Sequence, residues 1–237
     1  MFTLHNGDCL EYMKTLAPAS VDCIITDPPY GVAFRGNDWD NFIPNWIEQA
    51  RSIAKFVIFT TGTTTLWDYP RPDWVISWYR EASNSRSKLG GFSHWSPIVV
   101  YGTPKFKVDI LKLHAMAVGQ ENLSIDHPSP KPVKLMKWLI QNSSNEGETI
   151  FDPFMGSGTT GVAAVQLQRN FIGCELDPKY YSIAENRIKS AALQPALFTP
   201  SNNRLHMDAG DSPRLPSQST LEGFTPAEQG TTPAPRQ

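Results

Sequence analysis

The sequence predicts an α/β protein built on a mostly parallel, doubly wound sheet of seven strands. Short apolar runs rich in β-branched residues alternate with stretches of helical periodicity, which is the pattern of this class. The chain has 237 residues, of which 40% are apolar, enough for the core of one large domain. The seven predicted strands are 3–5, 21–26, 56–60, 74–79, 98–101, 149–151 and 171–175.

Helices are predicted between these strands. Asp8 is placed to cap a first helix that ends before Pro18, and Asp177 to cap the last one. Residues 31–44, 81–93 and 102–130 are polar or rich in Pro, Gly and Ser, so they predict loops, and we expect the sheet to be interrupted in the third. The expected helices after the first are 45–54, 132–141, 161–168 and one from 178 onward.

The composition changes near the end of the chain. Residues 196–237 are rich in Pro, Ser, Thr, Gln and Gly and contain few large apolar side chains. Such a segment cannot bury enough apolar surface to offset the entropy that ordering costs. It predicts a disordered tail.

Composition excludes several classes of protein. No run of about 18 apolar residues is present, so we expect no transmembrane helix, and the first residues lack the pattern of a signal peptide. The three cysteines, Cys9, Cys23 and Cys174, have no metal-finger spacing and are expected to be reduced thiols. We therefore expect a cytoplasmic protein without a metal site.

Charge is unevenly distributed. The net charge is −2, yet nine basic residues stand against four acids between Arg80 and Lys137. A basic region in an acidic chain is typical of a surface that contacts a polyanion. A solvated face explains it equally well.

The first chemically distinctive stretch is Asp27-Pro28-Pro29-Tyr30, directly after the strand 21–26. Each proline has a fixed φ angle and no N–H, so the backbone carbonyls there point in set directions. Asp27 and one such carbonyl can accept both hydrogens of an amino group, while Tyr30 offers a flat face to an aromatic ring. The stretch suits a planar ring with an amino group, such as a nucleobase. The alternative is a plain strand-to-loop turn with a tyrosine in the core.

The second distinctive stretch joins the strand 149–151 to the helix 161–168. Gly156, Gly158 and Gly161 have the G-x-G-x-x-G spacing, which lets the backbone turn sharply and approach a ligand. Glu175 ends the next strand, where an acid suits the two hydroxyl groups of a ribose. No lysine follows the glycines, so a phosphate-binding P-loop is not expected. The pattern indicates an adenosyl cofactor, with a structural turn as the alternative.

Asp152 separates the two adenosyl cofactors that remain, NAD and S-adenosylmethionine. A carboxylate just before the glycines repels a pyrophosphate and attracts the α-ammonium group of S-adenosylmethionine. We therefore expect S-adenosylmethionine. The alternative role of Asp152 is to cap the turn at the end of the strand.

Together these residues resemble the amino-group DNA methyltransferases, which modify adenine at N6 or cytosine at N4. Asp27-Pro28-Pro29-Tyr30 matches the catalytic motif of that family, and residues 152–160 (DPFMGSGTT) match its cofactor motif. The catalytic motif comes first, as in the circularly permuted β group. The resemblance covers about residues 4–190 and implies the Rossmann-like fold of S-adenosylmethionine-dependent methyltransferases.

The resemblance also implies roles for single residues. Asp8 and Cys9 match the segment that approaches the cofactor adenine, and Glu175 matches the acid that binds its ribose. Lys131, in a motif that opens at His127, belongs to a group of polar residues that meet the methionine carboxylate. The implied cofactor-binding residues are Asp8, Cys9, Lys131, Asp152, Pro153, Phe154, Gly156, Ser157, Gly158, Thr159, Glu175 and Leu176.

The implied catalytic residues are Asp27, Pro28, Pro29 and Tyr30. Asp27 and the Pro28 carbonyl would accept the two hydrogens of an exocyclic amine, so that the nitrogen lone pair points at the sulfonium methyl group. Attack is then a direct displacement without a covalent enzyme intermediate. A base inside a duplex cannot reach this motif, so it must flip out and stack on Tyr30.

The implied organisation is a methyltransferase domain over 1–195 and a tail over 196–237. The domain comprises a catalytic half (1–101), a target-recognition segment (about 102–126) and a cofactor half (127–195). The segment is shorter than is usual in the family, so we expect a short target, relaxed specificity, or reading shared with Arg80–Ser93 and the loop after Tyr30. Lys105, Lys107 and Lys112 are expected to contact phosphates or to be solvated.

Adenine is the expected target, because an acid at the first position of the motif is commoner in the adenine enzymes, and Ser in the cytosine enzymes. Cytosine N4 is the first alternative. More remote ones are a methyltransferase acting on RNA or on a protein amide, an NAD-dependent oxidoreductase, and a catalytically silent DNA-binding protein. The expected partner is double-stranded DNA, in a setting of DNA methylation and restriction-modification, with a homodimer left open as the assembly.

Overall fold

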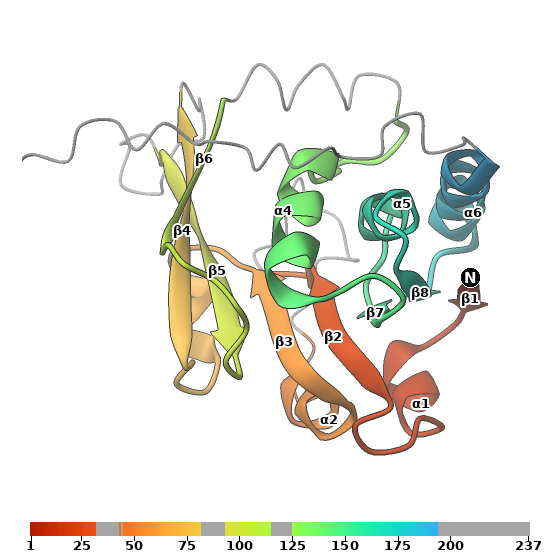
Figure 1. Ribbon diagram of the computed structural model, residues 1–237, viewed down its shortest axis with the longest axis horizontal. Helices are drawn as coiled ribbons and strands as arrows, with labels where there is room; N and C mark the ends of the chain where they lie inside the picture. The colour runs from red at the N-terminus through yellow and green to blue at the C-terminus, as the bar shows by residue number, and fades with distance from the viewer. Residues whose placement is uncertain (32–42, 44, 82–92, 115–124, 194–237) are drawn as a thin grey trace, which may run out of the picture. The chain divides into compact units, whose positions relative to one another are not determined.

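Eight strands form one sheet among the residues that the computed structural model describes (Figure 1). Those residues are 1–31, 43, 45–81, 93–114 and 125–193, and they belong to one compact unit, Met1–Leu197. The strands are β1 (Phe2–Asn6), β2 (Val21–Thr26), β3 (Ala54–Thr60), β4 (Trp74–Glu81), β5 (Trp95–Tyr101), β6 (Ile110–His114), β7 (Thr149–Asp152) and β8 (Asn170–Glu175).

The order of the strands brings the two halves of the chain together inside the sheet. Across the sheet the order is β1-β8-β7-β2-β3-β5-β4-β6. The strands from β1 to β3 are all parallel, β5 is antiparallel to both of its neighbours, and β6 is parallel to β4. The chain order reverses between β7 and β2. Ligands of open α/β sheets bind beyond the carboxyl ends of the strands at such a reversal.

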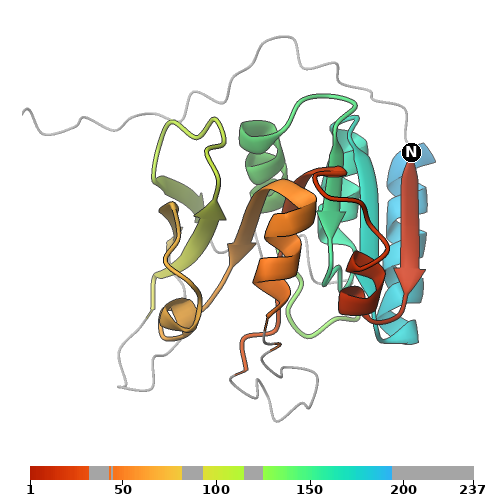
Figure 2. The same ribbon diagram turned by 90° about the horizontal axis from the view of Figure 1, so that it is seen from below.

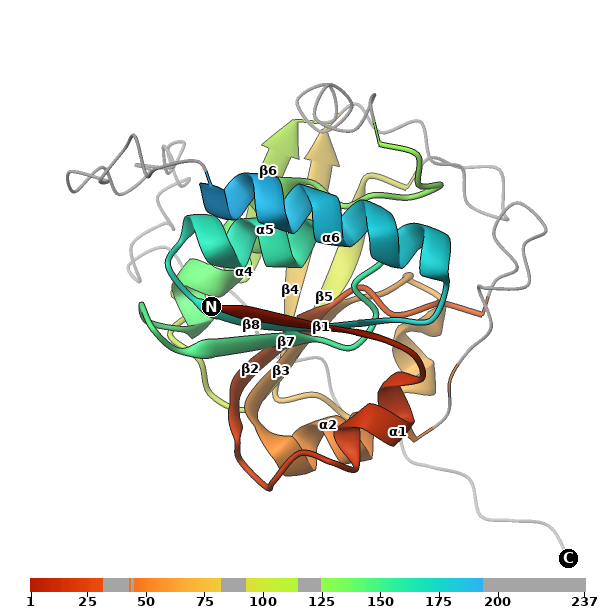
Figure 3. The same cartoon turned by 90° about the vertical axis from the view of Figure 1, so that its right-hand side faces the viewer.

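Helices cover both faces of the sheet (Figure 3). The view from below shows α1 (Cys9–Met13) and α2 (Trp46–Ile53) on the face toward the viewer (Figure 2). The short 3-10 helix η2 (Thr65–Asp68) follows β3. One face carries α4 (Val133–Ser143), α5 (Thr159–Gln166) and α6 (Pro178–Leu193), and the other carries α1 (Cys9–Met13) and α2 (Trp46–Ile53).

Strand β2 is buried from both faces, which is why its sequence is an apolar run instead of an alternation. Cys23 and Ile25 pack in the core beneath α4, α5 and α6, whereas Ile24 packs in the core beneath α1 and α2. In this second core the buried Trp46 ring of α2 meets the Phe154 ring edge-on, with centroids 5.3 Å apart. Because Phe154 follows β7, this contact ties α2 to the carboxyl ends of the strands.

The predicted α/β class with a mostly parallel sheet is confirmed, but the predicted strand number of seven is wrong. The additional strand, β6, lies in a segment for which the sequence predicts no strand, and it pairs with β4. A run of five residues is too short to show a clear period. Pairing with β4 buries Leu111 and leaves Ile110 41% exposed, a tertiary effect that the local sequence does not contain.

The predicted helices are confirmed with shifts at their ends. Helix α1 ends at Met13 instead of continuing toward Pro18, and α5 begins at Thr159, two residues earlier than predicted. Asp8 caps α1 as expected, because its carboxylate accepts a hydrogen bond of 2.7 Å from the Leu10 N–H.

Other predictions fall outside the described residues. They concern most of the loops over 31–44 and 81–93, residues 115–124 of the target-recognition segment, and the tail over 196–237. These remain predictions.

Gly161 provides a test of how closely α5 packs on α6 and β8. A Cβ atom at this position would lie 2.4 Å from Ile188 Cδ1 and 2.7 Å from Phe171 Cε1. Glycine to alanine inside a helix ordinarily stabilises by about 1 kcal/mol, whereas overpacking a core costs about 1–3 kcal/mol. We expect Gly161→Ala to lower the free energy of unfolding, measured in urea, by about 1–2 kcal/mol.

The matched control is Ser190→Ala on the exposed side of α6, which should change the free energy of unfolding by less than about 0.5 kcal/mol. A Gly161→Ala protein that is as stable as the parent, or more stable, would contradict the packing.

Candidate active site

The two sequence motifs follow adjacent strands. Asp27–Tyr30 begins directly after β2, and Asp152 is the last residue of β7, the parallel neighbour of β2. Thr26 joins them, because its hydroxyl group donates a hydrogen bond of 2.6 Å to Asp152 Oδ1. Both predicted parts of the site thus lie at one edge of the sheet, where the strand order reverses.

Asp27 is the centre of the first part. Its Oδ1 accepts hydrogen bonds from the Tyr30 hydroxyl group, at 2.7 Å, and from the Thr60 hydroxyl group. Its Oδ2 pairs with the ammonium group of Lys131. The two carboxylate oxygens therefore have different partners, two hydroxyl groups on one and a cation on the other.

Tyr30 is held in one orientation by its hydroxyl group, which contacts Asp27 and lies 3.3 Å from Thr60 Oγ1. Burial, and after it the charge of Asp27, raise the pKa of Tyr30 well above its usual value, so the phenol stays protonated. The two prolines before it are buried and half-buried, as expected of a rigid turn. A phenol fixed in this way presents its ring as a flat surface.

Thr60 is a member of this cluster that the sequence reasoning missed. It is the last residue of β3 and is fully buried. The parallel register aligns Thr26 with Phe59, so the next positions along the two strands, Asp27 and Thr60, are neighbours. In the sequence, Thr60 is only a hydroxyl residue at the end of the strand that follows β2. It can be assigned to the site only when the parallel pairing of β2 with β3 is known.

The second part of the site is the glycine-rich turn between β7 and α5. Gly156 and Gly158 have φ angles of 49° and 78°, a backbone conformation that side chains rarely adopt. The Gly156 N–H donates a hydrogen bond of 2.9 Å to Glu175 Oε2, so the turn contacts the end of β8. The other predicted residues of the turn are buried or half-buried: Pro153, Phe154, Ser157 and Thr159.

Glu175 and Asp8 lie at neighbouring strand ends. The register pairs Glu175 with Asn6 of β1, and Asp8 comes two residues later. Burial raises the pKa of Glu175. At the same corner Leu176 is 71% exposed, whereas Cys9 is buried and burial, then the charge of Asp8, raise the pKa of its thiol to about 12. The acids and the exposed Leu176 form the corner that the sequence assigns to the adenosine part of the cofactor.

Asp152 lies beneath the turn and is 2% exposed. Its Oδ1 accepts hydrogen bonds from Thr26 and from the Phe154 N–H, at 3.0 Å. Burial raises the pKa of Asp152 to about 7, although hydrogen bonds from Thr160, Thr26 and the backbone lower it. These contacts fit the alternative role, a cap of the turn. The role at the cofactor ammonium group remains a prediction.

Lys131 has a partner that the sequence did not predict. The predicted contact was the carboxylate of the cofactor, whereas the structure pairs the lysine with Asp27 in a partly shielded ion pair, with side chains 13% and 22% exposed. The residue precedes α4, so this ion pair connects the cofactor half of the chain to the catalytic motif. Its cofactor role remains a prediction.

Arg187 and His127 also contact the glycine-rich turn. Arg187 of α6 donates hydrogen bonds to the backbone oxygen of Ser157 and, at 3.3 Å, to the Thr159 hydroxyl group. His127 Nε2 lies 3.0 Å from the position that a Cβ atom on Gly156 would take. His127 belongs to a motif that the sequence showed, but no spacing rule pointed to Arg187.

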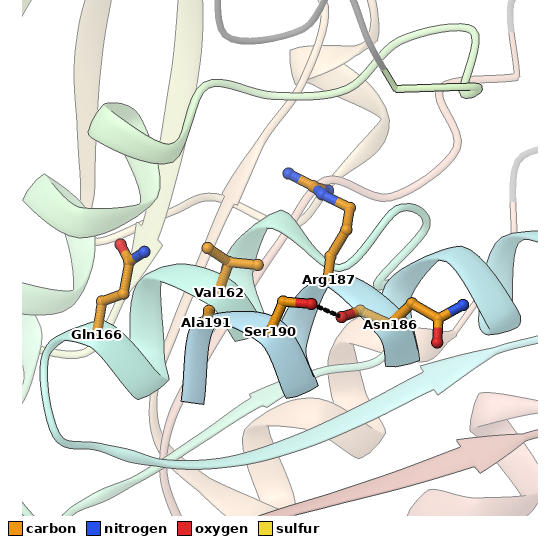
Figure 4. Close-up of a pocket in the computed structure, with 6 residues that line it drawn as sticks. All are labelled: Val162, Gln166, Asn186, Arg187, Ser190 and Ala191. Atoms are coloured by element: carbon orange, nitrogen blue, oxygen red, sulfur yellow. Dashed lines mark hydrogen bonds between the residues drawn. The ribbon is translucent and has the colours of Figure 1, made fainter. Parts of the chain in front are cut away.

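A shallow pocket of about 330 Å³ lies between α5 and α6 (Figure 4). None of the residues predicted from the sequence lines it, but Arg187 does, and Arg187 also contacts the glycine-rich turn. Its lining residues are Val162, Gln166, Asn186, Arg187, Ser190 and Ala191.

Lys105 lies away from the catalytic edge. Its backbone N–H donates to Asn142 O at 3.0 Å, and its ammonium group lies 3.3 Å from Asn145 Oδ1. Asn145 precedes β7, so Lys105 is near the amino ends of the strands, the edge opposite Asp27. This position favours the alternative of a solvated lysine over a phosphate contact beside the site.

Within the described ranges, no helix is long and apolar enough to cross a membrane, and no three His, Cys, Asp or Glu side chains are grouped to hold a metal ion.

Comparison with known proteins agrees with the geometry. An N6/N4 methyltransferase family model, described as DNA methylase, matches residues 109–186, which include the glycine-rich turn. The Type II methyltransferase M2.MboI of Moraxella bovis is 28% identical over 78% of this chain and 87% of its own length. The DNA adenine methyltransferase YhdJ of Escherichia coli is 25% identical over 80% of this chain and 83% of its own length.

Solved structures show the same fold. The complex of M1.HpyAVI with S-adenosylmethionine superimposes with a TM-score of 0.61 at 25% identity, over 79% of this chain and 100% of that one. The cytosine-N4-specific PvuII DNA methyltransferase gives a TM-score of 0.60 at 15% identity, over 78% of this chain and 86% of that one, a likeness of fold alone.

The fold and the site thus define an S-adenosylmethionine-dependent methyltransferase. More narrowly, the chain is similar to the amino-group DNA methyltransferases of the adenine-N6/cytosine-N4 family, through the family model over residues 109–186 and through relatives of 25–28% identity. The residues present fit the cofactor, because Gly156 and Gly158 give the turn a backbone conformation that side chains rarely adopt, and two acids, Asp8 and Glu175, stand at or just beyond the adjoining strand ends.

Asp152 predicts a pH dependence of stability. Its pKa is about 7 in the folded protein and 3.8 as an ordinary carboxyl group. Between these values the folded state keeps a proton that the unfolded state has lost, so this group's contribution to stability falls as the pH rises from about 4 to about 7. Asp152→Asn removes this fall. The free energy of unfolding of the variant, relative to the parent, should increase by more than about 1 kcal/mol from about pH 5 to about pH 8 in urea titrations.

Asp68→Asn, at an exposed carboxylate, is the control and should give a flat difference over the same range. Parallel profiles for Asp152→Asn and the parent would show that Asp152 is ionised throughout.

Proposed function

We propose that this protein transfers the methyl group of S-adenosylmethionine to N6 of an adenine that has flipped out of double-stranded DNA. The observation that carries the proposal is Asp27, held beside Tyr30 one strand away from the glycine-rich turn. In this family an acid at the first position of the motif is typical of the adenine enzymes. The name of the relative YhdJ, a DNA adenine methyltransferase, supports the same base.

The contacts of Asp27 suggest how the amine is oriented. The lone pair of the exocyclic nitrogen is delocalised into the ring, which makes it a poor nucleophile. Oδ1 of Asp27 is engaged by two hydroxyl groups, so we assign Oδ2 to one amine hydrogen and the Pro28 carbonyl to the other. These hydrogen bonds favour a pyramidal nitrogen with a directed lone pair.

The other residues bind and position the reactants. S-adenosylmethionine supplies the methyl group from a sulfonium ion. With the cofactor bound, the amine nitrogen would bond the methyl carbon as the carbon–sulfur bond breaks, which would leave S-adenosylhomocysteine as a neutral thioether, and the methylated amine would pass one proton to solvent. Tyr30, fixed through its hydroxyl group, supports the flipped base by stacking. We assign the cofactor to the twelve residues that the sequence implies, and target recognition to about 102–126, whose described part includes β6.

The proposal is tested by the product. Purified protein is incubated with unmethylated DNA and labelled S-adenosylmethionine, and the DNA is digested to nucleosides for mass spectrometry. N6-methyladenine supports the proposal, and sequencing the same DNA gives the target. N4-methylcytosine would overturn the choice of base, because both amines present two hydrogens to the same motif. No methylated base, with cofactor binding intact, would exclude DNA methylation by this chain alone.

Asp27→Ala should abolish methylation, by at least about a thousandfold, because the amine loses its charged acceptor. The variant should still bind S-adenosylhomocysteine and be stabilised by it in a thermal-shift assay, whereas NAD should stabilise neither protein. Loss of cofactor binding together with activity would instead point to a structural role for Asp27.

Thr60→Val should lower kcat about tenfold, because Asp27 loses one of the two donors that orient its carboxylate. The matched control is Thr61→Val. Thr61 is equally buried, but its hydroxyl group contacts Thr65 and not Asp27. Equal losses of kcat in the two variants would mean that Thr60 acts only through packing.

A further inference from the structure

Lys131 makes the contact that the proposed function gives to the target amine. Its ammonium group pairs with Asp27 Oδ2, the carboxylate oxygen that the two hydroxyl groups leave available. It also lies 5.5 Å from the centroid of the Tyr30 ring, on which the flipped base is to stack. An ammonium group and an amino group are both N–H donors, and the two cannot hold the same place. Lys131 and the base therefore compete for Asp27.

A neutral amine is the weaker competitor. The ion pair is largely shielded, since the Lys131 side chain is 13% exposed and that of Asp27 is 22% exposed. Separating a shielded pair leaves a charge without compensation, which is far more costly than separating an exposed pair. Lys131 is therefore released from Asp27 most easily when another anion receives its ammonium group.

The surroundings of the glycine-rich turn indicate where such an anion binds. Arg187 contacts the turn from α6, and the His127 ring lies beside Gly156, with Nε2 3.0 Å from where a Cβ atom on that glycine would be. Lys131 is within electrostatic reach of the same place, because burial first and then the charge of Lys131 and, more weakly, that of Arg187 lower the pKa of His127 to about 4. The turn also begins α5, so the partial positive charge of a helix N-terminus adds to the charges of Lys131 and Arg187. A carboxylate is the group that this region attracts.

We infer that Lys131 keeps the target amine away from Asp27 until the carboxylate of S-adenosylmethionine, bound at the glycine-rich turn, takes over the lysine's ammonium group. The inference rests on the proposed function for the identity of the amine, and it adds an order of binding, cofactor before base. Lys131 is then a positioning residue with two alternating partners.

A fixed ion pair is the alternative, in which Lys131 only compensates the charge of Asp27. In that case Lys131 does not interact with the cofactor carboxylate. The two explanations differ in how variants bind two ligands, S-adenosylhomocysteine and its decarboxylated analogue, which lacks only the carboxylate.

The first experiment is calorimetric titration of Lys131→Met with both ligands. Methionine keeps most of the apolar stem of lysine and removes the charge. The variant should bind S-adenosylhomocysteine on the order of tenfold more weakly than the parent, as expected for one lost charge-assisted hydrogen bond, and should bind the decarboxylated analogue within about twofold of the parent. Lys134→Met, at an exposed lysine of α4, is the matched control and should leave both affinities unchanged.

Asp27→Asn should change the affinity for S-adenosylhomocysteine in the opposite direction. This test remains valid even if the Lys131→Met protein does not fold. Without the carboxylate of Asp27, Lys131 loses the partner that competes with the cofactor. S-adenosylhomocysteine should then bind about three- to tenfold more tightly, and the decarboxylated analogue should not. Unchanged discrimination between the two ligands in these variants would overturn the inference.

The third experiment measures whether the target base leaves the duplex. It requires that the methylated sequence has been mapped. A fluorescent adenine analogue at the target position of a duplex becomes brighter when it leaves the stack. The parent protein should require S-adenosylhomocysteine for this increase, whereas Lys131→Met should show it without any cofactor. A protein that methylates DNA but shows the increase equally with and without cofactor would contradict the order of binding. If the ligand titrations give the expected affinities but no DNA is methylated, the proposed function is wrong. The exchange of Lys131 between Asp27 and the cofactor carboxylate would still be supported.

Discussion

The pairing of β2 with β7 is the constraint on which the site depends. These strands come from the first and the second half of the chain, yet they are parallel neighbours at the point where the strand order reverses. Parallel strands have their carboxyl ends at one edge, so the motif after β2 and the turn after β7 must meet. The hydrogen bond from Thr26 to Asp152 aligns the two ends. Displacing β7 by one residue would separate the motif that begins at Asp27 from the glycine-rich turn.

Two carboxyl groups at these strand ends are kept in different electrostatic surroundings. Asp27 is partly exposed and has a cation on one oxygen, whereas Asp152 is enclosed among hydroxyl and N–H donors and its pKa is raised by burial. The charge of Asp27 raises the pKa of Asp152 further. Asp27 thus stays partly open to solvent, whereas Asp152 is enclosed by donors of the neighbouring strand end and of the turn. The same residue type has different properties because of its environment.

The fold class and the two motifs were predictable because each is encoded locally. Asp27–Tyr30 and the glycine-rich turn are continuous stretches at strand ends, and both lie where the sequence places them. Thr60 and Arg187 were missed because their roles come from pairing and from the packing of α6, which bring together residues far apart in sequence. Strand β6 was missed for the same reason, since only β4 gives it a partner. Lys131 was named from the sequence, but its ion pair with Asp27 was not, because that contact also joins residues far apart in sequence.

The threonines at the carboxyl ends of the strands have a consequence for the reorganisation of the site. Thr26 and Thr60 end their strands fully buried, and each donates its hydroxyl proton to a carboxylate. A hydroxyl group can turn about its C–O bond and exchange donation for acceptance without moving a heavy atom. A change of charge at Asp152, whose pKa is about 7, can therefore be answered by rotation of the Thr26 hydroxyl proton, with no movement of the backbone. The end of β2 can thus adapt to either charge of its neighbour through a hydrogen atom alone.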